Sequence, residues 1–126
     1  MTPLNLKSIT VALLLGLTLG VGCSRTSPPP TPLALEELPA ALEKAFSKAQ
    51  ADTKELANQV VAAVQAGDYS KAFLAIQTLA GQPGLTKEQL SVTSRATLTV
   101  NGLLEAAQAK GDAKAAQTLK TYRGDK

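Results

Sequence analysis

The residue best suited to covalent chemistry is Cys23, the single cysteine of a 126-residue chain. It follows residues 8–22, a stretch without a charged side chain, and the small residues Gly20 and Gly22 stand just before it. A lone cysteine cannot form a disulfide within the chain, and its thiolate is a nucleophile that forms thioethers. This position predicts a modified cysteine beside a processing site.

The segment ahead of Cys23 has the layout of a secretory signal peptide. Lys7 and the amino terminus supply positive charge, an apolar core follows, and small residues mark a cleavage point. The apolar core is short for a transmembrane helix, which needs about 20 apolar residues. Two alternatives remain: ordinary cleavage that leaves a soluble secreted chain with a free thiol, and an uncleaved N-terminal anchor.

The run Leu19-Gly-Val-Gly-Cys23 resembles the lipobox of bacterial prolipoproteins. The resemblance implies that residues 1–22 are removed, and that Cys23 receives a diacylglyceryl group and becomes the mature N-terminus. The membrane is then a partner, bound through the acyl chains on Cys23. The implied location is the bacterial cell envelope, at the outer membrane or the outer face of the cytoplasmic membrane. In this family in enteric-type bacteria, an aspartate after the cysteine retains the protein at the inner membrane. Ser24 stands at that position here, which implies transport away from the inner membrane.

Residues 23–38 are predicted to form a tether. Four prolines lie between Ser24 and Pro32, and such a composition favours extended polyproline II at about 3.1 Å per residue. Plain disorder would serve the same purpose, because either conformation spaces the following domain from the bilayer.

Residues 39–123 are predicted to be α-helical. Pro39 suits a first helical turn, and one amphipathic helix then continues to Ala66, although Asp52 with Glu55 could cap a new start. Thr86 with Gln89 is the signature of a capping box at the start of a third helix. Its inward stripe is expected to contain Leu90, Thr93, Thr97, Val100, Leu104 and Ala107.

Two Gly-Asp pairs separate the predicted helices. Gly67-Asp68 and Gly111-Asp112 each combine a residue that ends helices with a favoured N-cap. The first pair precedes a helix over residues 69–80, and the second precedes a short helix that includes Tyr122. The predicted fold is therefore all-α, a small bundle of about four helices arranged as two antiparallel hairpins. Residues 124–126 are expected to be a flexible tail.

Residues 92–100 also fit a β-strand. Apolar and polar side chains alternate there, and Asn101-Gly102 follows as a turn signal. An isolated hairpin would lack a partner sheet and be marginally stable. The helical stripe and the capping box favour helix.

The two halves of the domain resemble each other, and one of them resembles a known repeat. Residues 60–68 are echoed by residues 103–112. Residues 65–72, Gln-Ala-Gly-Asp-Tyr-Ser-Lys-Ala, are similar to the turn and second helix of a tetratricopeptide repeat. That resemblance implies a peptide-binding groove, for which Tyr69 and Phe73 are the aromatic candidates; a place in the core is the alternative for both.

The C-terminus holds a second candidate attachment point, Lys126. The ending Thr-Tyr-Arg-Gly-Asp-Lys is similar to that of murein lipoproteins. The resemblance implies that Lys126 is joined to peptidoglycan. The alternative is a solvated tail.

Composition argues against several classes of function. Histidine is absent, so the commonest general base and metal ligand is missing. The 13 basic and 10 acidic residues are dispersed, without the basic, aromatic-rich cluster of a nucleic-acid binder. No catalytic residues, metal ligands, cofactor or small-molecule substrate are predicted.

The sequence thus predicts a non-enzymatic, membrane-anchored envelope lipoprotein with a helical scaffold or protein-interaction domain. A protein partner or self-association would follow from that role. The alternatives are a structural lipoprotein linked to peptidoglycan through Lys126 and a soluble, secreted, peptide-binding helical protein.

Overall fold

The computed structural model describes residues 28–124, and this part of the chain forms five helices. The described residues contain no β-strand, so the all-α prediction is confirmed and residues 92–100 are helical. The helices are α1 (Leu38–Phe46), α2 (Ala51–Gln65), α3 (Tyr69–Ala80), α4 (Lys87–Ala109) and α5 (Ala113–Gly124).

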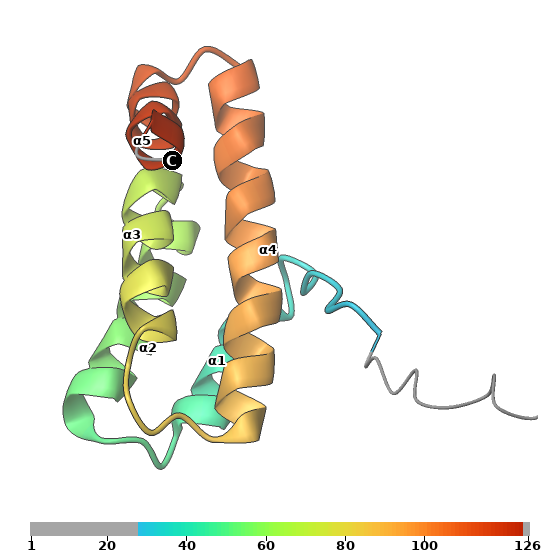
Figure 1. The fold of residues 1–126 in the computed structure, drawn as a ribbon, viewed down its shortest axis with the longest axis vertical. Helices are drawn as coiled ribbons and strands as arrows, with labels where there is room; N and C mark the ends of the chain where they lie inside the picture. The colour runs from blue at the N-terminus through green and yellow to red at the C-terminus, as the bar shows by residue number, and fades with distance from the viewer. Residues whose placement is uncertain (1–27, 125–126) are drawn as a thin grey trace, which may run out of the picture.

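Helix α4 runs along the length of the domain, and the other helices are arranged around it. Helices α1, α2, α3 and α4 form a closed ring in which α2 packs on α1 and α3, while α4 packs on α3 and α1. Helix α5 turns back beside the far half of α4 (Figure 1). The domain is therefore a four-helix bundle extended at one end by the α4–α5 hairpin.

The two Gly-Asp pairs form the same turn. The N–H groups of Asp68 and Gly67 donate to the carbonyls of Ala63 and Val64 at 2.9 and 3.1 Å, the pattern of a Schellman motif. Gly67 has φ 72°, a conformation that glycine adopts without steric cost. Gly111 and Asp112 repeat the motif at the end of α4. The predicted caps are thus confirmed in both hairpins.

The starts of the helices agree with the local sequence signals. Thr86 and Gln89 make both bonds of the capping box at the start of α4, and Pro39 lies in the first turn of α1. Gln89 also donates from Nε2 to the carbonyl of Ala45 at 3.2 Å. The cap of α4 therefore also satisfies a carbonyl near the end of α1.

The prediction of one continuous helix up to Ala66 is wrong. Helix α1 ends at Phe46 and α2 begins at Ala51, after Gln50 takes the extended values φ −59° and ψ 153°. The Ser47 hydroxyl donates to the carbonyl of Lys44, a local bond that competes with helix continuation. The break lets α1 fold against both α2 and α4.

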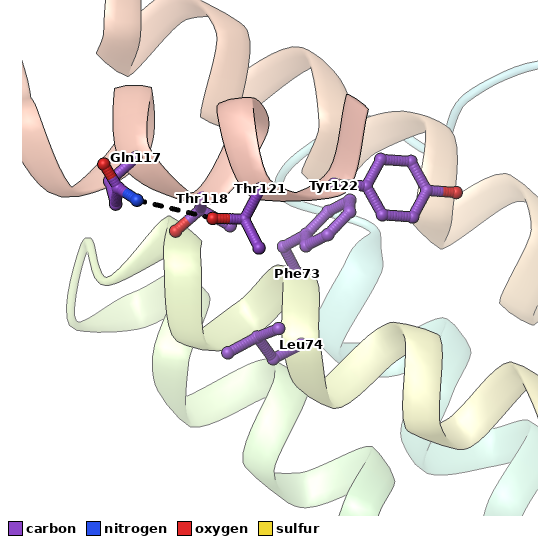
Figure 2. A pocket seen from close by; sticks show the side chains of 6 residues that line it. All are labelled: Phe73, Leu74, Gln117, Thr118, Thr121 and Tyr122. Carbon is purple, nitrogen blue, oxygen red and sulfur yellow. Dashed lines mark hydrogen bonds between the residues drawn. The ribbon is translucent and has the colours of Figure 1, made fainter. Parts of the chain in front are cut away.

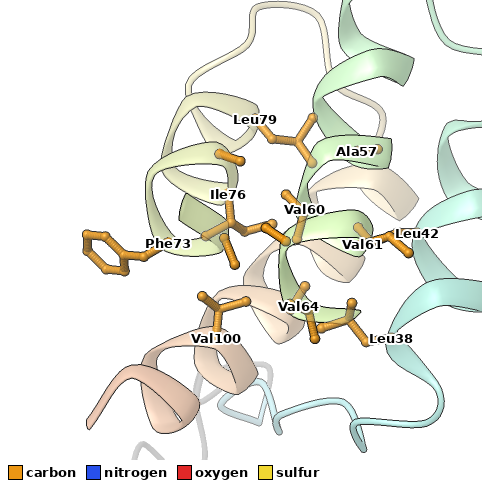
Figure 3. Close-up of a cluster of buried hydrophobic side chains, with 14 of the residues drawn as sticks. Leu38, Leu42, Ala57, Val60, Val61, Val64, Phe73, Ile76, Leu79 and Val100 are labelled. Atoms are coloured by element: carbon orange, nitrogen blue, oxygen red, sulfur yellow. The ribbon is translucent and has the colours of Figure 1, made fainter. Parts of the chain in front are cut away.

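A single core connects the helices (Figure 3). Ile76 and Leu79 of α3 point toward Val60 of α2, while Leu38 and Leu42 enter from α1. Many of the buried side chains are alanines, so each buries little area. The buried apolar residues are Leu33, Leu38, Leu42, Phe46, Ala57, Val60, Val61, Ala63, Val64, Ala72, Phe73, Ala75, Ile76, Leu79, Ala96, Val100, Leu104, Ala115 and Leu119.

The inward face of α4 is rotated relative to the predicted stripe. Thr93, Val100 and Leu104 are buried as predicted, and Ala96 joins them. Leu90, however, is 48% exposed. The helical spacing of the predicted stripe is therefore correct, but the buried face is turned toward Ala96 and away from Leu90.

Residues 30–33, here called the strap, pack on α4. Leu33 is only 5% exposed and belongs to the core. Its carbonyl accepts the Thr99 hydroxyl at 2.7 Å, and the carbonyl of Thr31 accepts Arg95 Nε at 2.9 Å. The chain leaves the domain beside the middle of α4 (Figure 1). The predicted tether over residues 23–38 is therefore too long, because its last part belongs to the folded domain.

Asp68 connects the two hairpins electrostatically. Its carboxylate accepts the Lys71 backbone N–H at 3.0 Å as the N-cap of α3. Lys114 Nζ, from the first turn of α5, lies 3.0 Å from each carboxylate oxygen. The backbone bond from Lys71 and then the hydrogen bond from Lys114 lower the pKa of Asp68 below its ordinary 3.8.

Replacing Leu33 by alanine tests whether the strap is part of the domain. Leu33→Ala should lower the free energy of unfolding by about 2–4 kcal/mol, because a buried leucine side chain is lost. Urea-induced unfolding of the full-length chain, followed by circular dichroism, measures the change. The control is Leu35→Ala, two residues away and 46% exposed, which should cost less than about 0.5 kcal/mol. Equal effects of the two substitutions would contradict a docked strap.

Asp68→Asn tests the charge that links the hairpins. Asparagine still caps α3 but does not titrate. Since the folded-state pKa of Asp68 is lowered, its charge stabilises the fold above about pH 4, and the stabilisation is lost as the pH falls further. Wild type should therefore be more stable than Asp68→Asn at pH 7, and the difference should shrink towards about pH 2. Urea unfolding at several pH values measures it, with Asp52→Asn on α2 as control. A difference that does not change with pH would contradict the prediction.

Candidate functional site

The two residues predicted to be attachment points, Cys23 and Lys126, lie outside the described residues. The same holds for the predicted signal peptide over residues 1–22 and for the end of the tail. Both attachments therefore stay predictions. Of the five described helices, none combines the length and the apolar character that crossing a bilayer would require.

A groove of about 330 Å³ lies between α3 and α5. Figure 2 shows Phe73 and Leu74 on α3 facing the side chains of α5. Helix α5 reaches this place because the Schellman turn at Gly111 folds it back along α4. The lining residues are Phe73, Leu74, Gln117, Thr118, Thr121 and Tyr122.

Two aromatic rings form one end of this groove. The rings of Phe73 and Tyr122 are 5.0 Å apart at an angle of 81°, the edge-to-face geometry that aromatic pairs favour. Phe73 is buried, whereas Leu74 is 61% exposed beside it. The groove thus has an aromatic wall, and the side chain of Leu74 beside it is open to solvent.

The two threonine hydroxyl groups of the groove are hydrogen-bonded within α5. Thr118 Oγ1 donates to the carbonyl of Lys114 at 2.9 Å, and Thr121 Oγ1 accepts Gln117 Nε2 at 3.5 Å. Lys114 itself is held by Asp68. Within residues 28–124, no group of three or more acidic, cysteine or histidine residues is placed to hold a metal ion. The lining is suited to contact with an apolar side chain.

The two aromatic residues proposed for a repeat-like groove do not share one cavity. Phe73 packs in the core and forms the wall of the α3–α5 groove. Tyr69, one turn earlier, is half-buried and lines a separate hollow of about 500 Å³ with Leu103 and Asp112. A peptide bound in one hollow would therefore meet one of these two residues. For Phe73, the alternative that it belongs to the hydrophobic core is confirmed.

Sequence reasoning did not find the α5 side of the groove. Gln117, Thr118 and Thr121 lie on one helical face, a spacing visible in the sequence. Which element this face meets depends on the angle at the Gly111 turn. The spacing therefore predicts that these side chains share one face of the helix, but it does not predict that this face meets α3.

Comparison with known proteins gives no relative: no family model, no curated protein and no solved structure matches this chain.

Proposed function

We propose that this chain is a non-enzymatic lipoprotein of the bacterial cell envelope, anchored through acyl chains on Cys23. The observation that carries the proposal is the place of the single cysteine, between an uncharged apolar stretch and a proline-rich segment. Two acyl chains bind a membrane stably, since each buried CH₂ group contributes about 0.8 kcal/mol. The helical domain is then the part held outside the bilayer.

The docked strap supports a short and defined spacer. The strap begins at Pro30, so six residues, 24–29, separate it from Cys23; a proline-rich spacer of this length would reach about 19 Å if extended at about 3.1 Å per residue. The bonds from Arg95 and Thr99 hold the strap on α4. A domain tethered in this way is attached at the middle of its longest helix.

Two aspartates that could have been site residues instead cap helices, which supports a scaffold role. Asp68 and Asp112 accept backbone N–H groups at the starts of α3 and α5. Both are explained by helix capping. The domain then acts through its surface, by contact with another envelope protein or a second copy.

Cys23→Ala tests the anchor. The substituted chain should lose its acyl chains, and membrane fractionation should find it mainly in the soluble fraction or still carrying residues 1–22. Ser24→Ala is the matched control and should remain lipidated. Mass spectrometry of the mature N-terminus, which should show a diacylated Cys23, provides the direct measurement.

Two results would contradict the anchor. One is a mature chain that begins elsewhere or carries a free thiol at Cys23. The other is processed Cys23→Ala protein that remains bound to the membrane. The same mass spectra examine Lys126, because a muropeptide on the C-terminal peptide would support the wall-linked alternative.

A further inference from the structure

Helix α5 lies outside the ring formed by the other four helices. Each of α1, α2, α3 and α4 packs on two neighbours within that ring, whereas α5 is added to α4 and α3 at one end of the domain (Figure 1). The Schellman turn at Gly111 connects it to α4. Helix α5 can therefore move away without breaking a contact between two helices of the ring.

Few apolar side chains hold α5 in place. Of its 12 residues, two are buried, Ala115 and Leu119. Helix α3 has the same length, and six of its residues are buried. Tyr122 adds an edge-to-face contact with Phe73, but it is 43% exposed. Because the burial of apolar surface is the main favourable term in packing, α5 is attached more weakly than α3.

Two ion pairs flank the buried face of α5. Lys114 pairs with Asp68, in the turn before α3, at 3.0 Å, and Arg123 pairs with Glu105 of α4 at 2.8 Å. Lys114 and Arg123 are nine positions apart in the sequence. At about 100° per residue, they lie about 180° apart around the helix. One ion pair therefore holds each side of the face that carries Leu119.

We propose that α5 is a lid that opens as a unit about the turn at Gly111, while α1, α2, α3 and α4 stay folded. Regions with few buried apolar contacts open locally at a lower free energy than the whole domain. The turn suits a hinge, because glycine adopts positive and negative φ about equally readily, and Gly111 has φ 93° in the closed form.

Opening uncovers an apolar surface on α3. In the closed form the ring of Phe73 is 2% exposed and packs against Tyr122. Leu74 lies beside it and is already exposed (Figure 2). When α5 leaves, the groove of about 330 Å³ between the two helices loses one wall. The lid therefore controls whether the ring of Phe73 is accessible.

Ionic strength sets how often the lid opens. The described residues form two ion pairs, and both join α5 to the rest of the domain. Their four side chains are 33–66% exposed, so dissolved salt screens both pairs. Added salt therefore weakens the attachment of α5 and acts on no ion pair within the described ring. The lid does not depend on lipidation of Cys23, because the contacts that hold it lie within residues 68–123.

Thiol labelling at buried alanines tests the lid. Ala115→Cys in the first turn of α5 and Ala57→Cys on α2 change residues that are 1% and 2% exposed. Both are made in the full-length Cys23→Ala chain, so that the introduced thiol is the only one. Position 115 should be labelled at least about tenfold faster than position 57, because the lid opens more often than the ring. Fraying from the far end of α5 does not expose position 115, which lies beside the hinge.

A second pair of variants tests the role of the ion pairs. Glu105→Gln removes the partner of Arg123 and should raise the labelling rate at position 115 by about two- to fivefold, the effect of losing one exposed ion pair. The rate at position 57 should not change. Glu55→Gln, an exposed glutamate on α2, is the matched control and should alter neither rate. Raising NaCl from about 0.01 M to about 0.15 M should speed labelling at position 115 alone.

Amide hydrogen exchange of the Cys23→Ala chain, followed by NMR, examines the same opening without a new thiol. The N–H of Ala116 donates to the carbonyl of Asp112 at 3.0 Å in the first turn of α5. If α5 opens as a unit, Ala116 should be protected no better than the middle of α5 and about tenfold less than the core of α2. Protection of Ala116 equal to that of α2 would overturn the proposal, as would equal labelling rates at positions 115 and 57.

Discussion

The continuity of α4 is the constraint on which the rest of the domain depends. This 23-residue helix packs on α1, α3 and α5 and also holds the strap. Several of its residues are β-branched threonines, which lower helix propensity slightly. Two of them bond the preceding turn, Thr97 to the carbonyl of Thr93 and Thr99 to that of Arg95. Their hydroxyls are thereby satisfied in a partly buried position, and the helix continues through a segment whose alternation also fits a strand.

The sequence predicts the parts of this fold that depend on neighbours along the chain. Capping at Thr86, Asp68 and Asp112 requires only residues within one turn of the helix start, and all three caps are present. The break after Phe46 was missed because the apolar stripe stays in phase across it. Phe46 and Ala57 are eleven residues apart, close to three helical turns, so periodicity alone cannot show that the backbone turns between them.

Tertiary contacts explain the other differences. The prolines around Leu33 indicate an extended spacer, and residues 30–33 have no regular secondary structure, but the burial of Leu33 depends on α4, more than sixty residues later. The α3–α5 groove likewise depends on the angle at a turn. The spacing of Leu90 predicts that it is buried in the core, yet Leu90 is exposed and Ala96 is the α4 residue that is buried. A one-face periodicity defines a stripe only to within about one position, so its edge residues are the least predictable.

The core of the domain is thin, and two leucines of α4 remain outside it. Alanines allow the helices to approach closely but bury little apolar area, so the domain gains a small stabilisation from each contact. Apolar side chains such as Leu90 and Leu98 remain at the surface because no helix of residues 28–124 covers them. If the lipid anchor proposed for Cys23 is present, the domains are confined to a thin layer beside one bilayer, where weak contacts through these leucines would form more readily than in free solution.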